Sequence, residues 1–285
     1  MSNKKILLED KLAFNDNFTV NMPKTIGFRT EISCVNDYGE ILFEKAHNQT
    51  VLGGAIFTML KLFNVNHDWN VATLNELMNI ANDGTTVDSR DNYVCLFGVG
   101  TGGAGDSAKS VKDVKVYERE IEQMIPLRLV NFELSDSDKE RYWFKKQITA
   151  TDPETHVSND YDAYYLKTFD MTSSKILWKD GVGESDGSDV EENVYATNRT
   201  EPIQSFIQCT LRIDAEDCKE WFKFQGDIEV PRINSLALFT GVKSELSTGE
   251  YEYKDVRMFS KLNIDNQTLQ LDKGMTFFYR IYILV

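Results

Sequence analysis

Residues 92–105 read NYVCLFGVGTGGAG, and the residues that follow this glycine-rich run decide between two fold classes. Three of its glycines match G-x-G-x-x-G, a pattern that binds a dinucleotide where a strand ends and a helix begins. Residues 106–120 read instead DSAKSVKDVKVYERE, in which Val114 and Val116 alternate with charged residues. This alternation predicts a polar loop followed by a strand, so the helix that a pyrophosphate needs is missing.

The same run does not complete a phosphate loop. That loop needs the order G-x-x-x-x-G-K-[ST], and counting from Gly100 places Asp106 where the lysine belongs. A carboxylate at that position repels phosphate instead of neutralising it. We therefore interpret the run as a tight structural bend and expect no bound nucleotide. The glycines that we expect to contact another subunit are Gly98, Gly100, Gly102 and Gly103.

The composition describes a folded and acidic protein. The chain has 285 residues, of which 41% are apolar and 12% aromatic, enough for a sizeable core. Its net charge of −14 argues against a broad nucleic-acid-binding surface, because phosphate contacts need clustered lysine and arginine. The four cysteines are widely spaced without a C-x-x-C pair, so we expect buried free thiols and a reducing compartment.

No segment predicts secretion or membrane insertion. The first residues contain only Ile6–Leu8 as an apolar run, which is too short for the core of a secretory signal peptide. The longest apolar stretch, 51–63, is interrupted by two glycines and Lys61, and it is too short for a membrane span. We therefore expect no membrane partner.

Hydrophobic periodicity predicts three helical segments. Apolar residues recur at helical spacing from 51 to 64, and a second helix is expected near 72–81. A third is expected at 213–224, where Asp214 would be the N-cap and Asp217 the third residue of a capping box.

The rest of the chain is rich in strand patterns. Residues 26–46 hold two apolar runs separated by NDYG, which predicts a hairpin. Several later runs alternate polar and apolar residues, as RYWFKKQI does at 141–148. The predicted strands after residue 90 are YVCLFGV, VKVYERE, IPLRLVNFE, RYWFKKQITA, DAYYLKTF, KILWKD, SFIQCTLRI, NSLALFTGV, YKDVRMFSKLNI and MTFFYRIYILV. We expect a β-rich α+β protein, with β-sandwich or barrel-like sheets and one or two packed helices.

Two segments are expected to lie outside the sheets. Residues 1–25 predict an irregular N-terminal arm before a single β-rich domain over 26–285, for which a subdivision near residue 90 stays open. The acidic stretch GVGESDGSDVEEN at 181–193 predicts an exposed loop. Its oxygens leave a calcium site open as an alternative, although the EF-hand order is absent. The residues that supply them are Asp186, Ser188 and Asp189.

The sequence carries no catalytic signature that we recognise. His47, His67 and His156 stand alone, without H-E-x-x-H or a pair at metal spacing. No G-x-S-x-G occurs, and no cysteine has a histidine partner along the sequence. We expect a protein that is not an enzyme and that holds no cofactor and no metal.

The order of four pieces carries a family resemblance. The pieces are HNQTVLGGAIFTMLKLFNV, YVCLFGVGTGGAGDS, QMIPLRLVN and the closing YKDVRMFSKLNIDNQTLQLDKGMTFFYRIYILV. In this order they resemble virion structural proteins of tailed bacteriophages, especially neck, tail and baseplate components of large phages. The resemblance implies a non-enzymatic assembly protein of the virion, assembled in the cytoplasm of the bacterial host. It implies a ring or other symmetric homo-oligomer in the head-to-tail connector, neck or tail, with other virion structural proteins as partners.

Two features are compatible with such an assembly. The closing strand, 275–285, is tied down at one end only, so it can add to the sheet edge of a neighbouring subunit. The acidic excess suits a passive conduit for DNA without specific binding, because attraction would slow passage. The strand residues that we expect to contact a neighbour are Phe277, Phe278, Tyr279 and Tyr282.

Two other functions stay open on the sequence. A carbohydrate- or receptor-binding β-sandwich module of a tail tip would present an aromatic platform, with calcium at 186–189 as an addition. The candidates for that platform are Trp143, Tyr164 and Tyr165. A β-rich glycoside hydrolase would need two carboxylates paired in one cleft.

Overall fold

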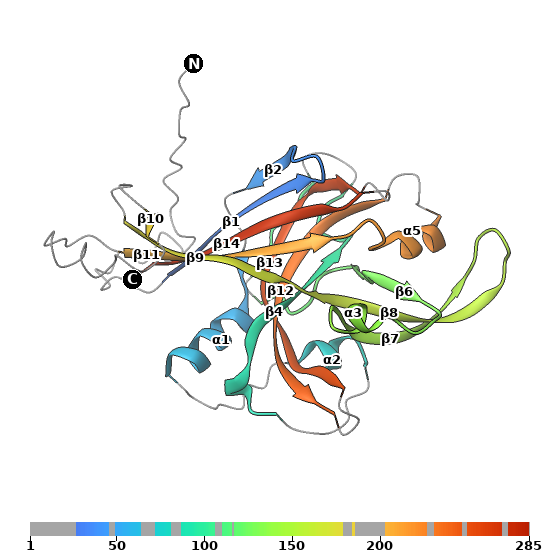
Figure 1. The fold of residues 1–285 in the computed structure, drawn as a ribbon, viewed down its shortest axis with the longest axis horizontal. Helices are drawn as coiled ribbons and strands as arrows, with labels where there is room; N and C mark the ends of the chain where they lie inside the picture. Colours follow the sequence, from blue (N-terminus) through green and yellow to red (C-terminus); the bar gives the residue numbers. More distant parts are fainter. Residues whose placement is uncertain are drawn as a thin grey trace, which may run out of the picture.

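The computed structural model describes eleven stretches of the chain: 27–45, 49–63, 72–80, 87–105, 110–115, 117–178, 184–185, 203–226, 231–246, 250–269 and 273–284. These residues build two antiparallel sheets with short helices packed around them (Figure 1). The expected β-rich α+β fold is confirmed. The N-terminal arm and the calcium residues 186–189 lie outside the described residues.

The first sheet has six strands in the order β10-β9-β11-β14-β1-β2. Their bounds are β1 Gly27–Asn36, β2 Ile41–Lys45, β9 Asp170–Trp178, β10 Glu184–Ser185, β11 Ile203–Ile213 and β14 Met275–Leu284. The turn between β1 and β2 is closed by the side chain of Asn36, whose Oδ1 accepts hydrogen bonds from the N–H groups of Tyr38 and Glu40. The hairpin predicted from NDYG is therefore confirmed.

The second sheet has eight strands in the order β3-β13-β12-β4-β8-β6, with β5 beside β4 and β7 beside β8. Their bounds are β3 Gln49–Thr50, β4 Tyr93–Gly100, β5 Met124–Ile125, β6 Arg128–Val130, β7 Tyr142–Thr151, β8 Ser158–Thr168, β12 Arg232–Glu245 and β13 Tyr251–Thr268. The predicted run IPLRLVNFE is split into β5 and β6 around Pro126, because proline has no N–H to donate to a strand ladder.

The main core lies between the two sheets. Phe277 of the first sheet and Phe97 and Leu238 of the second belong to one buried cluster. The neighbours Leu96 and Phe239 point to the other side of the second sheet and belong to a second buried cluster. Since both faces of β4 and β12 are covered, these strands read as continuous apolar runs instead of alternating ones.

The helices are short and lie at the margins of the sheets. α1 Leu52–Phe63 confirms the helix expected at 51–64 over its described part, and it packs on β13. A Cβ added to Gly53 would lie 2.1 Å from the backbone oxygen of Met258, so glycine permits this close approach. The other helices are α2 Leu74–Leu77, η1 Ser89–Asp91, α3 Asp136–Lys139 and α5 Lys219–Gln225. No helix within the described stretches is long and apolar enough to cross a membrane.

Three local expectations are wrong. The helix expected at 72–81 is a single turn with a capping box between Thr73 and Glu76, and it ends before Asn79, whose φ is 52°. The segment VKVYERE is not a strand where the structure describes it, because hydrogen bonds between Lys115 and Glu118 close a turn there. The helix expected at 213–224 begins only at Lys219.

β14 is a central strand, which corrects the expectation that it adds to a neighbour's sheet. Along Met275–Leu284 it pairs with β1 on one edge and with β11 on the other, so both of its hydrogen-bonding edges are occupied within the chain. Phe277 and Tyr279 are fully buried and Phe278 is half-buried, whereas the side chain of Tyr282 lies outside the described residues. A subunit contact at these four residues stays a prediction.

Candidate functional site

A cluster of charged side chains lies where the chain passes from one sheet to the other. β8 ends at Thr168 and β9 begins at Asp170, so the two strands form one continuous band that belongs to both sheets (Figure 1). Lys167 lies at this crossing, opposite Phe97 of β4 and Tyr142 of β7. Its side chain is only 1% exposed. A lysine so deeply buried needs partners for its charge.

Two carboxylates supply those partners. Lys167 Nζ donates hydrogen bonds to Asp217 Oδ2 at 2.6 Å and to Asp214 Oδ2 at 2.8 Å. The side chain of Asp217 is 0% exposed, and its Oδ1 accepts a 2.6 Å hydrogen bond from the hydroxyl of Tyr142. The ring of Tyr142 also lies under the ammonium, with Nζ 4.9 Å from the ring centroid. The buried charges are thus paired and hydrogen-bonded.

The turn after β11 brings the two aspartates together. The N–H of Asp214 donates to Asp217 Oδ2 at 2.9 Å, which is one of the two bonds of the predicted capping box. The bond closes a turn instead of a helix start, because Cys218 adopts a left-handed conformation with φ 62°. The N–H of Cys218 donates to the carbonyl of Leu127 at 2.7 Å, which fixes the turn beside β6.

Two arginines extend the cluster toward the solvent. Arg141 Nη2 lies 2.5 Å from Asp214 Oδ2, and Arg212 Nε donates to Asp214 Oδ1 at 3.2 Å. Arg212 also pairs with Asp37 in the turn between β1 and β2. Asp37 in turn accepts a 2.7 Å hydrogen bond from the N–H of Gly274, just before β14. The network therefore joins the crossing strand to the far hairpin of the first sheet.

The surroundings fix the protonation state of three of these groups. Burial raises the pKa of Asp214, but hydrogen bonds and charge from Lys167 and Arg141 outweigh it and lower this pKa to about 2. The hydrogen bond from Arg212 lowers the pKa of Asp37. Burial, followed by the charge of Asp217, raises the pKa of Tyr142, so its hydroxyl keeps its proton.

The geometry restricts what this cluster can do. Lys167 and Asp217 are closed off from solvent, so they cannot meet a soluble substrate such as the polymer that a glycoside hydrolase binds. Over the described stretches, no group of three or more His, Cys, Asp or Glu side chains is arranged to hold a metal ion. What the cluster offers is a buried amine in contact with one buried carboxyl group, one partly exposed carboxyl group and a phenol.

Comparison with known proteins gives a family without a known function. A family model described as "Family of unknown function (DUF7208)" matches residues 40–217, which is more than half of the chain. The chain belongs to this family. No curated protein and no solved structure matches the chain. The part shared with DUF7208 ends at Asp217, so it includes the buried centre of the cluster and leaves out Asp37.

The glycine run of this DUF7208 member packs against its own chain. A Cβ on Gly103 would lie 2.3 Å from the backbone oxygen of Asn234, and one on Gly102 would lie 2.5 Å from that of Glu122. The N–H of Gly103 donates to Asn234 Oδ1 at 2.7 Å, and that of Gly102 donates to the carbonyl of Glu122. Gly98 and Gly100 are buried as well. These contacts explain the glycines as a tight bend, and a subunit contact at the four glycines stays a prediction.

The aromatic residues proposed as a platform do not share one face. Tyr164 and Tyr165 are successive residues of β8, so they point to opposite sides of the second sheet and belong to different cores. Trp143 packs edge-to-face on Tyr253, with ring centroids 4.9 Å apart. A flat platform of these three side chains is therefore excluded.

All four cysteines are free and buried, as expected. Burial raises the pKa of Cys34 and of Cys209 to about 12, so neither thiol ionises near neutral pH. These residues fill the core and offer no nucleophile.

Proposed function

We propose that this protein is a non-enzymatic virion structural protein of a tailed bacteriophage, which forms part of the head-to-tail connector, neck or tail through contacts between subunits. The observation that carries the proposal is the apolar edge of the first sheet. Tyr38 is 67% exposed, Ile41 62% and Leu42 39%, and all three lie in the β1–β2 hairpin. We call these three side chains the hairpin patch.

A bulge explains why this patch faces outward. Cys34 pairs with Phe43 and Val35 pairs with Ile41, so Leu42 is the extra residue of β2. The extra residue breaks the alternation of faces, which leaves Ile41 and Leu42 both exposed while Phe43 packs on the ring of Phe277. An apolar edge strand of this kind is a surface for pairing with another chain, and proteins that stay monomeric usually protect it.

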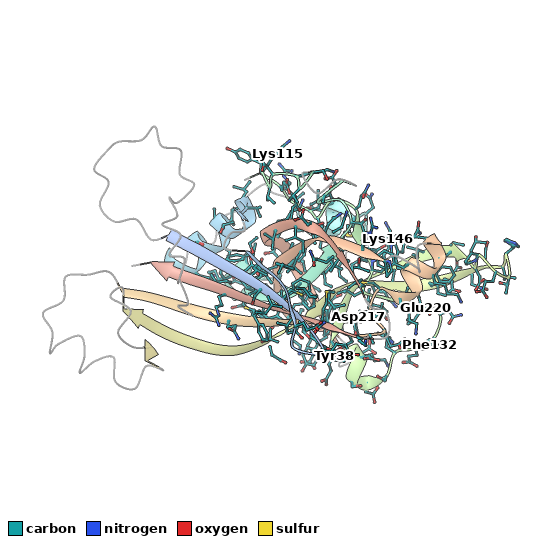
Figure 2. The ribbon with its side chains drawn as sticks, turned by 90° about the horizontal axis from the view of Figure 1, so that it is seen from above. Tyr38, Lys115, Phe132, Lys146, Asp217 and Glu220 are labelled. Carbon is teal, nitrogen blue, oxygen red and sulfur yellow. The ribbon has the colours of Figure 1, made fainter. Side chains whose placement is uncertain are left out.

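A second face offers a complement for a symmetric assembly. Figure 2 shows Tyr38 and Phe132 on one side of the molecule and Lys115 on the opposite side. Tyr117, two residues after Lys115, is 77% exposed. A closed ring needs two different faces of each subunit, one for each neighbour. Exposed aromatic side chains in separate segments of the chain support this type of contact between copies of the chain.

Oligomeric mass in solution tests the proposal. We expect the purified chain to form a defined oligomer by light scattering, and the double variant Ile41→Ser/Leu42→Ser to shift it toward monomer. Val157→Ser is the matched control, because Val157 is 53% exposed at the tip of the β7–β8 hairpin, away from the hairpin patch. A wild type that stays monomeric at all concentrations contradicts the proposal, and glycan binding by such a monomer would favour a tail-tip module instead.

A further inference from the structure

The side chains of Lys167 and Asp217 form a buried pair in which an amine contacts a carboxyl group. Both side chains are removed from solvent, and Lys167 Nζ lies 2.6 Å from Asp217 Oδ2. A proton that moves from Nζ to the carboxylate along this contact gives the neutral amine and the neutral carboxylic acid. Those neutral forms are the ones that can condense to an amide. Holding two reactants in contact also replaces a bimolecular encounter, with effective molarities of about 10⁵–10⁸ M in well-oriented cases.

We propose that Lys167 and Asp217 become joined after folding by an amide bond between Nζ and the side-chain carboxyl carbon. The overall reaction is balanced, because one ammonium and one carboxylate give one amide and one water. It involves no change of oxidation state and no co-reactant. The proposal is independent of the proposed function, since it concerns only groups inside a single chain.

The neighbouring groups supply the proton transfers that this reaction needs. Lys167 first passes a proton to Asp217 Oδ2 along their hydrogen bond, and the freed amine attacks the carboxyl carbon. Negative charge then develops on Oδ1, where the hydroxyl of Tyr142 already donates a hydrogen bond. Asp214, 2.8 Å from Nζ, accepts the next proton from the nitrogen and returns it to Oδ2, which leaves as water.

The arginines determine which carboxyl group reacts. Asp214 is bound by Arg141 and Arg212 as well as by Lys167, so it stays ionised and is a poor acceptor for the attacking amine. Asp217 has its hydrogen bonds from Lys167, from the hydroxyl of Tyr142 and from a backbone N–H. The proton released by the amine therefore goes to Asp217, which becomes the neutral acid that is attacked.

Such a bond would fix the crossing between the sheets. Lys167 and Asp217 are 50 positions apart in sequence, and the segment between them contains β9, β10 and β11. A covalent link there ties β8 of the second sheet to the end of β11 in the first. It would limit the freedom of the unfolded chain as a disulfide does, without depending on an oxidising compartment.

Intact mass spectrometry of the full-length wild type tests the bond directly. After incubation of the folded protein, we expect a mass lower than the sequence mass by one water molecule. Digestion under denaturing conditions should yield a branched peptide that joins Lys167 to Asp217, with no tryptic cleavage after residue 167. Lys167→Met, which keeps the volume but removes the amine, should show its full sequence mass. A folded wild type that keeps its full mass after prolonged incubation would overturn the proposal.

Further variants test the roles of the neighbours. Asp217→Asn can still react by releasing ammonia, so its linked product should have the same mass as the linked wild type. Asp214→Asn and Tyr142→Phe should slow formation of the bond by at least tenfold, whereas Lys145→Met, which removes only an exposed ion pair, should leave its rate unchanged. Asp214 and Asp217 lie in one tryptic peptide, 213–219, so fragmentation of the branched peptide must locate the bond. A bond at Asp214 instead of Asp217 would contradict the assignment, and so would an unchanged rate in Asp214→Asn.

Discussion

Lys167→Met should be among the most destabilising single changes to a polar residue in this protein. The substitution removes an amine that is 1% exposed and leaves Asp217, which is 0% exposed, without its main charge partner. Removing one member of a buried ion pair costs about 3–5 kcal/mol, because the remaining charge stays buried and uncompensated. Lys139→Met is the control, since Lys139 and Glu133 form an exposed pair whose loss should change the free energy of unfolding little.

Equilibrium unfolding in urea, followed by circular dichroism, measures both effects. A double variant, Lys167→Met/Asp217→Leu, separates an ion pair from a covalent bond. If the pair is ionic, replacing both charges by apolar side chains should recover most of the lost stability. If it is an amide, the double variant should stay less stable, because opening a loop of 50 positions costs about 4 kcal/mol of chain entropy.

One result would refute this reasoning. If Lys167→Met loses no more free energy of unfolding than Lys139→Met, at equal denaturant dependence, the buried pair does not hold the crossing together. A change in the denaturant dependence itself would show that the unfolded ensemble has changed, as expected when a covalent link is lost.

Three further predictions follow from single contacts. The pKa of Asp214 is about 2 in the folded protein, below its ordinary value of about 3.9. The stability that ionised Asp214 contributes is therefore complete above about pH 3.9 and is lost as the pH falls through about 2. Acid titration of Asp214→Asn should show a flatter loss of stability over that range. Gly103→Ala should lower the free energy of unfolding by about 1–3 kcal/mol through its clash with Asn234, and Gly105→Ala, whose Cβ would lie 3.1 Å from the nearest atom, should lower it less in the same urea assay. A thiol reagent should label no cysteine in the native protein and all of them on unfolding, and simultaneous labelling below the unfolding transition would contradict the burial of Cys34, Cys95, Cys209 and Cys218.

Most of the sheet structure could be predicted from the sequence, because it is encoded locally. Strands such as β7 and β14 are rich in β-branched and aromatic residues, and NDYG marks the first hairpin. The order of the strands within each sheet could not be predicted from the sequence. The sequence predicts that the last strand adds to a neighbour's sheet, yet this strand pairs on both edges with segments far away in sequence, β1 and β11. Nothing local in residues 275–284 distinguishes an edge strand from a central one.

The sequence predicts the contact between the two aspartates of the charge cluster but not their contacts with Lys167. The spacing of Asp214 and Asp217 correctly predicted that one side chain would accept the backbone N–H of the other. Lys167 gave a weaker signal, as a single lysine in the apolar run YYLKTF. A lysine there reads equally well as an exposed residue of a wetted face. Its partners are 47 and 50 positions away, so only the fold identifies them.

The glycine run and the charge cluster are both explained by contacts within the chain. Glycines suggest a ligand because they allow close approach to a backbone, but here the approaching groups are the chain's own Glu122 and Asn234. Buried charges are the stronger indication of a specific role, because each carries a desolvation cost that an apolar residue would avoid. A protein that keeps Lys167 and Asp217 at the junction of its two sheets gains from their chemistry or from the register they impose. The mass of the folded chain distinguishes these two explanations, because only the first removes a water molecule.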